Sequence, residues 1–238
     1  MTAADPTGAP VAAVESLNVR EVSREQVIAA MGPAATGGGA DSLFEVEWVS
    51  AADGGSTEAG AASWAVLGDS TLADGGGVFA DVEALVTSSQ DLPGTVVLEC
   101  PAVEGAAPVP DAVRDRLTGV LGVLQRWVAD ERLASSRLVV VTRGAVAASA
   151  DEPADVRIAP VWGLVRAAQA EHPGRFVLAD LPVGAGGEAL AAGLACAEPQ
   201  WAVRDGAVRV PRLVRAQVPA GEAPGFGDGP VLVTGASG

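Results

Sequence analysis

Short apolar runs recur through the middle of the chain, as in the strands of a buried parallel sheet. These runs occupy residues 63–69, 94–100, 136–143 and 175–181. The segment LFEVEW at 43–48 instead alternates apolar and polar residues, which predicts a half-buried strand. Residues 201–216 predict two short strands joined by Asp205-Gly206, a pair that favours a hairpin turn.

Apolar residues recur with the helical period between these runs. From Asp111 to Leu133 they form one face of a predicted helix. A second amphipathic helix ends at His172-Pro173-Gly174, a strong stop signal, and a third spans 187–197. The apolar stripe of the second helix comprises Ile158, Val161, Trp162, Val165 and Ala168. Strands that alternate with such helices indicate an α/β fold of the doubly wound kind, with a mainly parallel sheet flanked by helices.

The two ends of the chain differ from this middle part in composition and in hydrophobic pattern. Residues 11–23 predict a strand, and Ser23 with Gln26 has the spacing of a capping box for a short helix at 24–30. Beyond residue 216 the chain is rich in Pro and Gly, which is typical of a linker. The last apolar segment, GPVLVTGASG, predicts one more strand and a turn. The sequence thus divides into four segments: 1–40, 41–216, 217–228 and 229–238.

The 238-residue chain has a formal net charge of −15, with carboxylates spread along its length. This charge argues against nucleic acid and anionic membranes as partners. No apolar run approaches the roughly 18 residues that cross a bilayer, and the N-terminus lacks the basic start of a signal peptide. Cys100 and Cys196 are isolated and lack metal-ligand spacing, which favours reduced core thiols. We therefore expect a cytoplasmic protein.

Few side chains are candidates for chemistry. His172, the only histidine, could serve as a hydrolase base, but no G-x-S-x-G segment accompanies it. Its place at a helix exit favours an interaction with the helix dipole. Asp151, Glu152 and Asp155 form an acidic cluster that could bind a metal. Because they precede the second amphipathic helix, we favour a role in complementing the dipole of its first turn.

Aromatic and glycine-rich segments have equally plain interpretations. A stacking platform for nucleic acid would suit several tryptophans, but the acidic charge favours core positions instead. These tryptophans are Trp64, Trp127, Trp162 and Trp201. The glycine run at 75–77 has no following Lys and Ser or Thr, so it is not a phosphate loop of that type.

Five segments closely resemble the ketoreductase domains of modular type I polyketide synthases, in the order and spacing of that family. They are LFEVEW (43–48), SWAVLGD (63–69), 124–147, 160–181 and 198–216. In that family they belong to the N-terminal structural subdomain, a truncated Rossmann-like fold that binds no cofactor and braces the catalytic subdomain. The resemblance therefore assigns residues 41–216 to such a structural subdomain.

Both ends carry resemblances of their own. Residues 5–23 resemble the last strand of a dehydratase domain, which assigns 1–40 to the end of a preceding dehydratase-like domain plus linker. The segment 229–238 resembles the first strand and glycine-rich turn of the catalytic short-chain-reductase subdomain. That family's T-G-x-x-G-x-x-G loop brings backbone amides to the pyrophosphate of NADPH. The matching residues are Thr234, Gly235, Ala236, Ser237 and Gly238, an incomplete loop because its last glycine and following helix are missing.

Two residue types are absent from the chain, and their absence bears on catalysis. All 15 basic residues are Arg, so the sequence contains no Lys, and it contains no Tyr. Short-chain reductases use a Tyr as proton donor and a Lys that lowers the pKa of that Tyr. We therefore expect this chain by itself to catalyse nothing and to hold neither a cofactor nor a metal.

The resemblance implies a function for the parent protein. The parent would be a polyketide synthase that uses NADPH to reduce a β-ketoacyl thioester carried on the phosphopantetheine of an acyl carrier protein. The implied partners are the catalytic ketoreductase subdomain and the neighbouring dehydratase and acyl carrier protein domains. Two alternatives stay open: a free-standing dinucleotide-binding protein that uses the TGASG turn, and a docking platform for acyl carrier protein.

Overall fold

The structure is a computed structural model that describes residues 2–4, 10–13, 43–51, 63–73, 76–88, 91–101, 108–149 and 152–216. The chain divides into two compact units, one of Met1–Glu45 with Val214–Gly238 and one of Val46–Leu213. In the first unit, β1 (Thr2–Ala4) and β2 (Pro10–Ala13) form an antiparallel pair. β2 overlaps the start of the strand predicted at 11–23, and residues 14–23 lie outside the described residues. The predicted helix at 24–30, the linker and the last strand lie outside the described residues.

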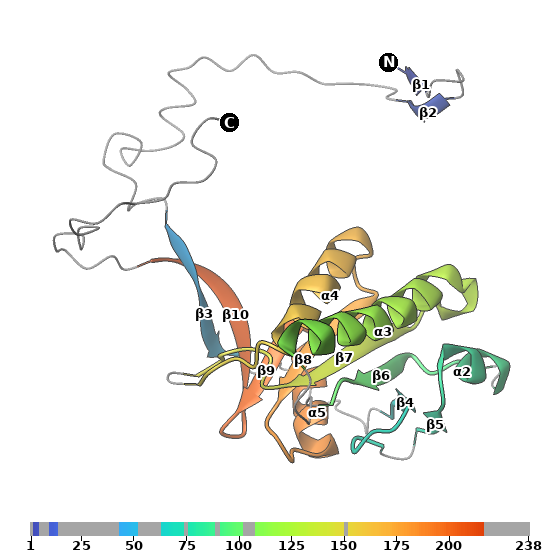
Figure 1. The fold of residues 1–238 in the computed structure, drawn as a ribbon. Helices are drawn as coiled ribbons and strands as arrows, with labels where there is room; N and C mark the ends of the chain where they lie inside the picture. The colour runs from blue at the N-terminus through green and yellow to red at the C-terminus, as the bar shows by residue number, and fades with distance from the viewer. Residues whose placement is uncertain are drawn as a thin grey trace. The chain divides into compact units, whose positions relative to one another are not determined.

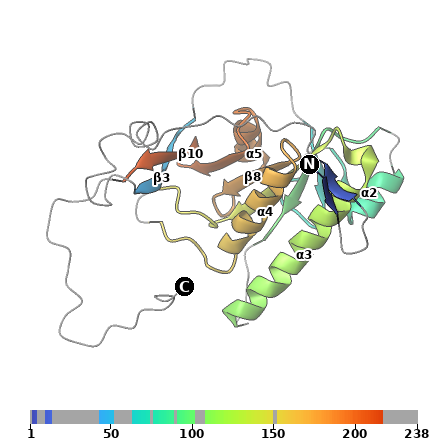
Figure 2. The same cartoon turned by 90° about the horizontal axis from the view of Figure 1, so that it is seen from above.

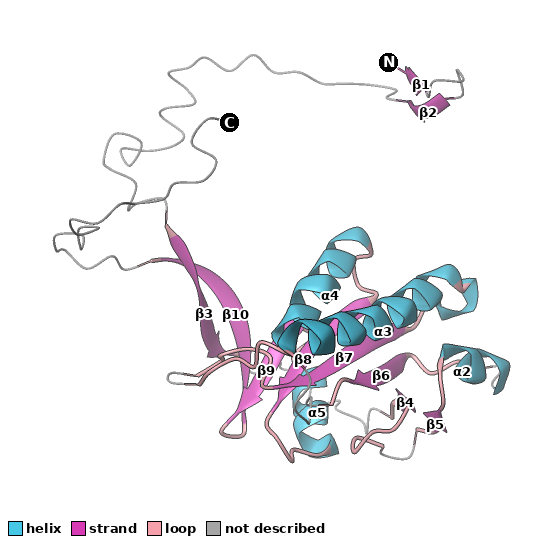
Figure 3. Cartoon of the chain, viewed as in Figure 1, coloured by secondary structure: helices cyan, strands magenta, loops and turns pink. Residues whose placement is uncertain are grey.

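The other described strands form one eight-stranded sheet, seen in Figures 1 and 3. They are β3 (Phe44–Ser50), β4 (Ala65–Leu67), β5 (Val78–Phe79), β6 (Thr95–Glu99), β7 (Arg137–Arg143), β8 (Phe176–Leu181), β9 (Gln200–Arg204) and β10 (Ala207–Arg215). Across the sheet their order is β3-β10-β9-β8-β7-β6-β4-β5. Neighbours from β5 to β9 run parallel, whereas β10 runs antiparallel to β9.

Helices cover both faces of this sheet. The described helices of this part are α2 (Val82–Ser88), α3 (Val109–Ala129), α4 (Ala159–Glu171) and α5 (Gly187–Leu194). α3 and α4 lie beside each other (Figure 2) and pack with α2 on one face, while α5 packs on the other. In β7, Leu138 and Val140 join the core under the first group, and Val139 and Val141 join the core under α5. The predicted α/β fold with a mainly parallel sheet flanked by helices is confirmed.

The predicted hairpin turn and helix stop are also confirmed. Asp205 and Gly206 join β9 to β10 with φ values of 52° and 74°, the left-handed backbone that this turn type requires. Gly174 follows α4 with a φ of 79°, a conformation that favours glycine after a helix end.

Two helix ends differ from the prediction. The helix expected to reach Leu133 ends at Ala129. The Asp130 side chain accepts a hydrogen bond from the Arg132 N–H at 3.0 Å and so begins a separate 3-10 helix, Glu131–Leu133. α5 ends at Leu194, earlier than the expected residue 197. β5 and α2 were not predicted, because elements of two and seven residues carry too little periodicity to be detected in a sequence.

The expectation that β3 is half-buried is wrong for most of its predicted length. Every residue from Phe44 to Glu47 is exposed, and partial burial begins only at Trp48 and Val49. The alternating pattern supplies an apolar face, but only this later part reaches the helical layer. There the Trp48 ring packs edge-on against Trp162 of α4, with the ring centroids 5.9 Å apart.

The four tryptophans assigned to the core are all buried, which confirms that interpretation. One of them, Trp201 of β9, packs against Gly193 of α5, where an added Cβ would overlap its ring. We therefore expect Gly193→Ala to lower the free energy of unfolding by about 1–3 kcal/mol, because the enclosed ring must move. The measurement is chemical denaturation followed by tryptophan fluorescence.

Gly163→Ala is the matched control for this substitution. Gly163 is an exposed glycine inside α4, and no atom lies within 4 Å of an added Cβ. Alanine is more stable than glycine in a helix interior, so the free energy of unfolding of this variant should rise by about 0.5–1 kcal/mol. A similar gain in both variants would show that α5 does not press against Trp201.

Candidate functional site

The carboxyl ends of β6 to β9 lie along one edge of the sheet, the carboxyl edge, and carry charged side chains. Glu99 ends β6, Arg143 ends β7 and Arg204 ends β9, while Asp180 is the last residue but one of β8. Glu99, Asp180 and Arg204 are buried. Open α/β sheets bind their ligands outside the carboxyl ends of the strands. This edge is therefore the candidate functional site of the described fold.

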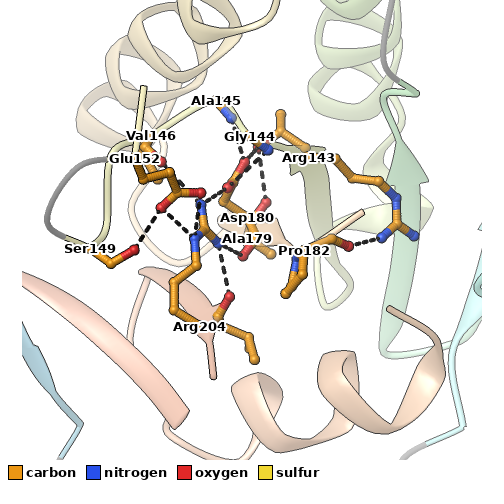
Figure 4. Close-up of polar contacts among 12 residues, drawn as sticks. Arg143, Gly144, Ala145, Val146, Ser149, Glu152, Ala179, Asp180, Pro182 and Arg204 are labelled. Carbon is orange, nitrogen blue, oxygen red and sulfur yellow. Dashed lines mark hydrogen bonds and ion pairs between the residues drawn. The ribbon is translucent and has the colours of Figure 1, made fainter. Parts of the chain in front are cut away.

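Asp180 accepts hydrogen bonds from four donors, and Figure 4 shows it close to Gly144, Ala145 and Arg204. Its Oδ1 atom lies 2.5 Å from the Thr142 hydroxyl and 2.8 Å from the Ala145 nitrogen. Its Oδ2 atom lies 3.2 Å from the Gly144 nitrogen and 2.6 Å from Nη2 of Arg204. A buried carboxylate is stable only when it is paired and hydrogen-bonded. These donors therefore fix the loop that follows β7 onto the end of β8.

Arg204 connects Asp180 to the same loop from the other side. Its Nε atom lies 2.7 Å from Oε2 of Glu152, and its Nη2 atom donates to the Val146 carbonyl at 3.0 Å. Burial by itself would raise the pKa of Glu152, but the hydrogen bond and charge of Arg204, together with hydrogen bonds from Ser149 and Ala148, hold that pKa below its usual value. Figure 4 shows Arg204 between the two carboxylates.

The network also reaches the helical layer. Nε1 of Trp162 in α4 donates to the Thr142 hydroxyl oxygen at 2.8 Å, and that hydroxyl donates to Asp180. A chain of buried hydrogen bonds thus runs from Trp162 through Thr142 and Asp180 to Arg204. Each buried polar group in it has a partner, as a stable interior requires.

A second charged cluster lies around Glu99. Nη2 of Arg143 lies 2.7 Å from Oε1 of Glu99, and both side chains are almost fully buried. The Ser70 hydroxyl, in the turn after β4, donates to Oε2 at 2.6 Å. Burial would raise the pKa of Glu99, but the hydrogen bonds from Ser70 and Arg143, together with the Arg143 charge, hold it below its usual value.

These clusters occupy the carboxyl edge with charges that are already paired. Glu99, Glu152 and Asp180 each accept hydrogen bonds from a guanidinium within the chain. The lowered pKa values of Glu99 and Glu152 hold these two in the charged form, and the oxygens of Asp180 are occupied by hydrogen bonds within the chain. Carboxylates in such contacts are poorly placed to take a proton from an external molecule. Across the described residues, no group of three or more His, Cys, Asp and Glu side chains could hold a metal ion. The geometry supports a structural role for this edge.

His172 lies where the sequence predicts, at the exit of α4. The backbone N–H of His172 donates to the Ala168 carbonyl at 2.9 Å. The His172 ring packs edge-on against Phe176, with the ring centroids 6.3 Å apart. Both cysteines are free, as predicted, but only Cys100 is a buried core residue, whereas Cys196 is half-buried. Burial raises the pKa of Cys100 to about 12. Cys100 is therefore a protonated core thiol at neutral pH.

The dipole interpretation of the acidic cluster is wrong. α4 begins only at Ala159, and its first turn contains no acidic residue. Glu152 instead binds Arg204, a stronger partner than a helix end several residues away. Asp155 accepts a hydrogen bond from the Arg157 N–H at 2.9 Å within the turn before the helix. Asp151 lies outside the described residues.

The predicted cofactor-binding residues cannot be placed. Thr234, Gly235, Ala236, Ser237 and Gly238 lie outside the described residues, so their assignment stays a prediction. In the glycine run at 75–77, Gly76 has a packing role, because an added Cβ would overlap the Trp64 carbonyl group. Within the described ranges, no helix combines the length and the apolar character needed to span a bilayer.

Sequence reasoning missed the residues that form the carboxyl edge. A usable signal was present, since a charged residue directly follows an apolar stretch, or follows it after one Thr, in four of the predicted strands: VVLE (96–99), VVVTR (139–143), VLAD (177–180) and WAVR (201–204). A charge directly after an apolar run has to be solvated or paired. In parallel strands these ends share one edge, so their mutual pairing was a testable hypothesis.

Residues 46–213 match the protein family described as "Polyketide synthase extender module SpnB, Rossmann fold domain". The chain is 42% identical over 253 residues to polyketide synthase GfsB of Streptomyces halstedii. It is also 42% identical over 228 residues to the spectinabilin polyketide synthase system protein NorB of Streptomyces orinoci. These matches cover 100% and 91% of this chain but 4% and 10% of the relatives, so the chain spans a small part of their length.

Solved structures of ketoreductases are similar to the described fold. A C2-type ketoreductase from a modular polyketide synthase matches with 25% identity and a TM-score of 0.54, over 74% of this chain and 44% of that chain. A structure of A-type ketoreductases matches with 24% identity and the same TM-score and coverage. The likeness supports the truncated Rossmann-like fold that the sequence resemblance implies.

Proposed function

The chain belongs to the family of Rossmann-fold domains from polyketide synthase extender modules, and we propose that it is the structural, non-catalytic half of a ketoreductase region. The other half would reduce a β-ketoacyl thioester with NADPH. The carboxyl edge carries this proposal, because paired charges of the chain fill the place where an open α/β sheet usually binds its ligand. The lack of Tyr and Lys supports it as well.

The described residues do not fit the pyrophosphate of NADPH. In dinucleotide-binding folds, a glycine-rich turn after the first strand leads into a helix whose N-terminus faces the phosphates. Here the residues described between β4 and β5, 68–73 and 76–77, contain turns and no helix. The Glu99 carboxylate binds this turn, and its negative charge would repel a phosphate.

NADPH is instead assigned to the catalytic half of the parent. Its first strand and glycine-rich turn correspond to residues 229–238, and 217–228 connect it to the structural half at 41–216. The support is the sequence match to the T-G-x-x-G loop of short-chain reductases. The residues proposed to contact NADPH are Thr234, Gly235, Ala236, Ser237 and Gly238.

Further partners follow from the length of the relatives, which are polyketide synthases far longer than this chain. Residues 1–40 are proposed to be the end of a dehydratase-like domain plus a linker. An acyl carrier protein with its phosphopantetheine would deliver the substrate. The net charge of −15 supports the absence of nucleic-acid and anionic-membrane partners, and the cytoplasm is the proposed location.

Strands β3 and β10 are the proposed contact surface for the catalytic half. Val46 of β3 is 54% exposed and Leu213 of β10 is 71% exposed, although both are large apolar residues. Neighbouring exposed apolar side chains are typical of a surface that another protein covers. The contact would bury them and brace the catalytic half.

The experiment compares this chain with the same chain extended through the catalytic half of its parent. We expect the extended protein to bind NADPH and to reduce a β-ketoacyl thioester. The chain alone should do neither. It contains no Tyr and no Lys, and the Glu99 carboxylate already binds the turn after β4. NADPH fluorescence titration and thioester turnover are the measurements. Saturable micromolar binding or any turnover by the chain alone would refute the structural assignment.

A matched pair of substitutions tests the bracing contact within this experiment. When the two halves are expressed as separate chains, Val46→Asp should weaken their association about tenfold or more, as measured by analytical ultracentrifugation. Val183→Asp is the control, since Val183 is 84% exposed in the loop after β8. If both variants associate with the catalytic half equally well, β3 is not part of the contact surface.

A further inference from the structure

The turn after β4 meets the end of β6 where the strand order reverses. From β4 the chain adds β5 on one side and then crosses to β6 on the other. Such a switch point forms the ligand crevice of open α/β sheets. Glu99 lies at this point in contact with Ser70, Thr71 and Arg143.

The groups that surround the Glu99 carboxylate are those that proteins use to bind oxyanions. The Thr71 backbone N–H donates to Oε2 at 3.0 Å, and the Ser70 hydroxyl donates to the same atom. Nε of Arg143 donates to Oε1 at 2.9 Å, and the Thr71 hydroxyl lies 3.4 Å from both oxygens. A backbone amide, hydroxyls and a planar guanidinium recognise carboxylates and phosphates alike.

These donors are also held in place by contacts that do not involve Glu99. Arg143 donates from Nη1 to the Pro182 carbonyl at 2.6 Å, drawn in Figure 4, and from Nη2 to the Ala185 carbonyl at 3.0 Å. The Ser70 hydroxyl oxygen accepts a hydrogen bond from the Leu72 N–H at 3.0 Å. These contacts would hold the donors in place when the carboxylate is removed.

A cavity beside the carboxylate gives access to these donors. Its volume is about 320 Å³, and its walls are formed by Thr71, Glu99, Pro101, Arg143 and residues 183–186. This volume is ample for a small anion with its water. Removal of the Glu99 side chain would connect the donors directly to the cavity.

We propose that the switch-point crevice is an oxyanion-binding site that the chain fills with its own Glu99 carboxylate. The ligand class is a small carboxylate or phosphate, which binds when Glu99 is removed. In the natural chain Glu99 excludes such groups, including the pyrophosphate of a dinucleotide. The inference goes beyond the structural role proposed above, because it concerns this chain by itself and does not depend on what the parent reduces.

The test is rescue of Glu99→Ala by added anions. The melting temperature is measured in chloride and in rising acetate or inorganic phosphate at constant ionic strength. Because phosphate stabilises many proteins without specific binding, the readout is the difference in Tm between variant and wild type. Binding to the vacated site should shrink this difference saturably, by about 3–6 °C at a tenfold excess over Kd.

Two variants separate site binding from general effects. Glu198→Ala removes a half-buried carboxylate that pairs with Arg212 at the surface, and its Tm difference should not depend on the anion. Glu99→Ala combined with Arg143→Met should lose the rescue. Rescue by acetate, phosphate or both supports the site and identifies the preferred oxyanion.

An unchanged Tm difference in both anions, or equal rescue of Glu198→Ala, overturns the proposal. If Glu99→Ala does not fold in chloride, refolding yield replaces Tm as the readout. Recovery by acetate or phosphate then supports the site, and no recovery overturns it. Neither outcome bears on whether the extended protein is a reductase, which the turnover experiment decides separately.

Discussion

Asp180→Ala is expected to lower the free energy of unfolding by about 3–5 kcal/mol, the usual cost of removing one partner of a buried ion pair. Asp180 is completely buried, and its loss leaves the Arg204 guanidinium without one of its two carboxylates. The N–H groups of Gly144 and Ala145 also lose their acceptor. Denaturant unfolding at neutral pH measures the change.

Two further variants are references for the size of the stability loss in Asp180→Ala. Asp180→Asn keeps one oxygen acceptor and the side-chain volume, so it should lose less than Asp180→Ala. Glu198→Ala breaks the exposed pair with Arg212 and should cost about 0–1 kcal/mol. If Asp180→Ala costs no more than Glu198→Ala, the Asp180 network does not hold the carboxyl edge together.

Trp162→Ala should also lower the free energy of unfolding by about 3–5 kcal/mol, because it leaves a large cavity between α4 and the sheet. Trp162 is 2% exposed and packs edge-on against Trp48. Its Nε1 atom donates to Thr142, and the Arg166 guanidinium lies 5.3 Å from its ring centroid. The same denaturation measurement applies.

Trp162→Phe separates the packing of the ring from its hydrogen bond. Phe retains most of the apolar contact but cannot donate to Thr142. We therefore expect the free energy of unfolding to fall by about 1–2 kcal/mol more than the smaller side-chain volume alone would explain. Leu121→Ala is the control, because the Leu121 side chain on α3 is 41% exposed. It should lower the free energy of unfolding much less than Trp162→Ala does. Unchanged stability in Trp162→Ala would mean that α4 does not pack as described.

The sequence by itself determined the fold class and the positions of most strands and helices. Apolar runs and the helical stripe depend on neighbours along the chain, so residues 136–143 and the stripe around Trp162 indicated β7 and α4 directly. The Asp205-Gly206 turn was predictable for the same reason, since its backbone conformation depends on two adjacent residues. Resemblance of several segments to one family supplied the family and its truncated fold.

Only the tertiary structure decided the pairing of charges at the carboxyl edge. Glu99 and Arg143 are 44 residues apart, and Asp180 and Arg204 are 24 apart, so no local pattern links them. Their contacts follow from strand order and register, which bring the ends of separate strands to one edge. The same holds for β3, whose apolar alternation predicted burial that its place in the sheet provides only near Trp48. Periodicity identifies an apolar face, but the elements that cover it are set by the whole fold.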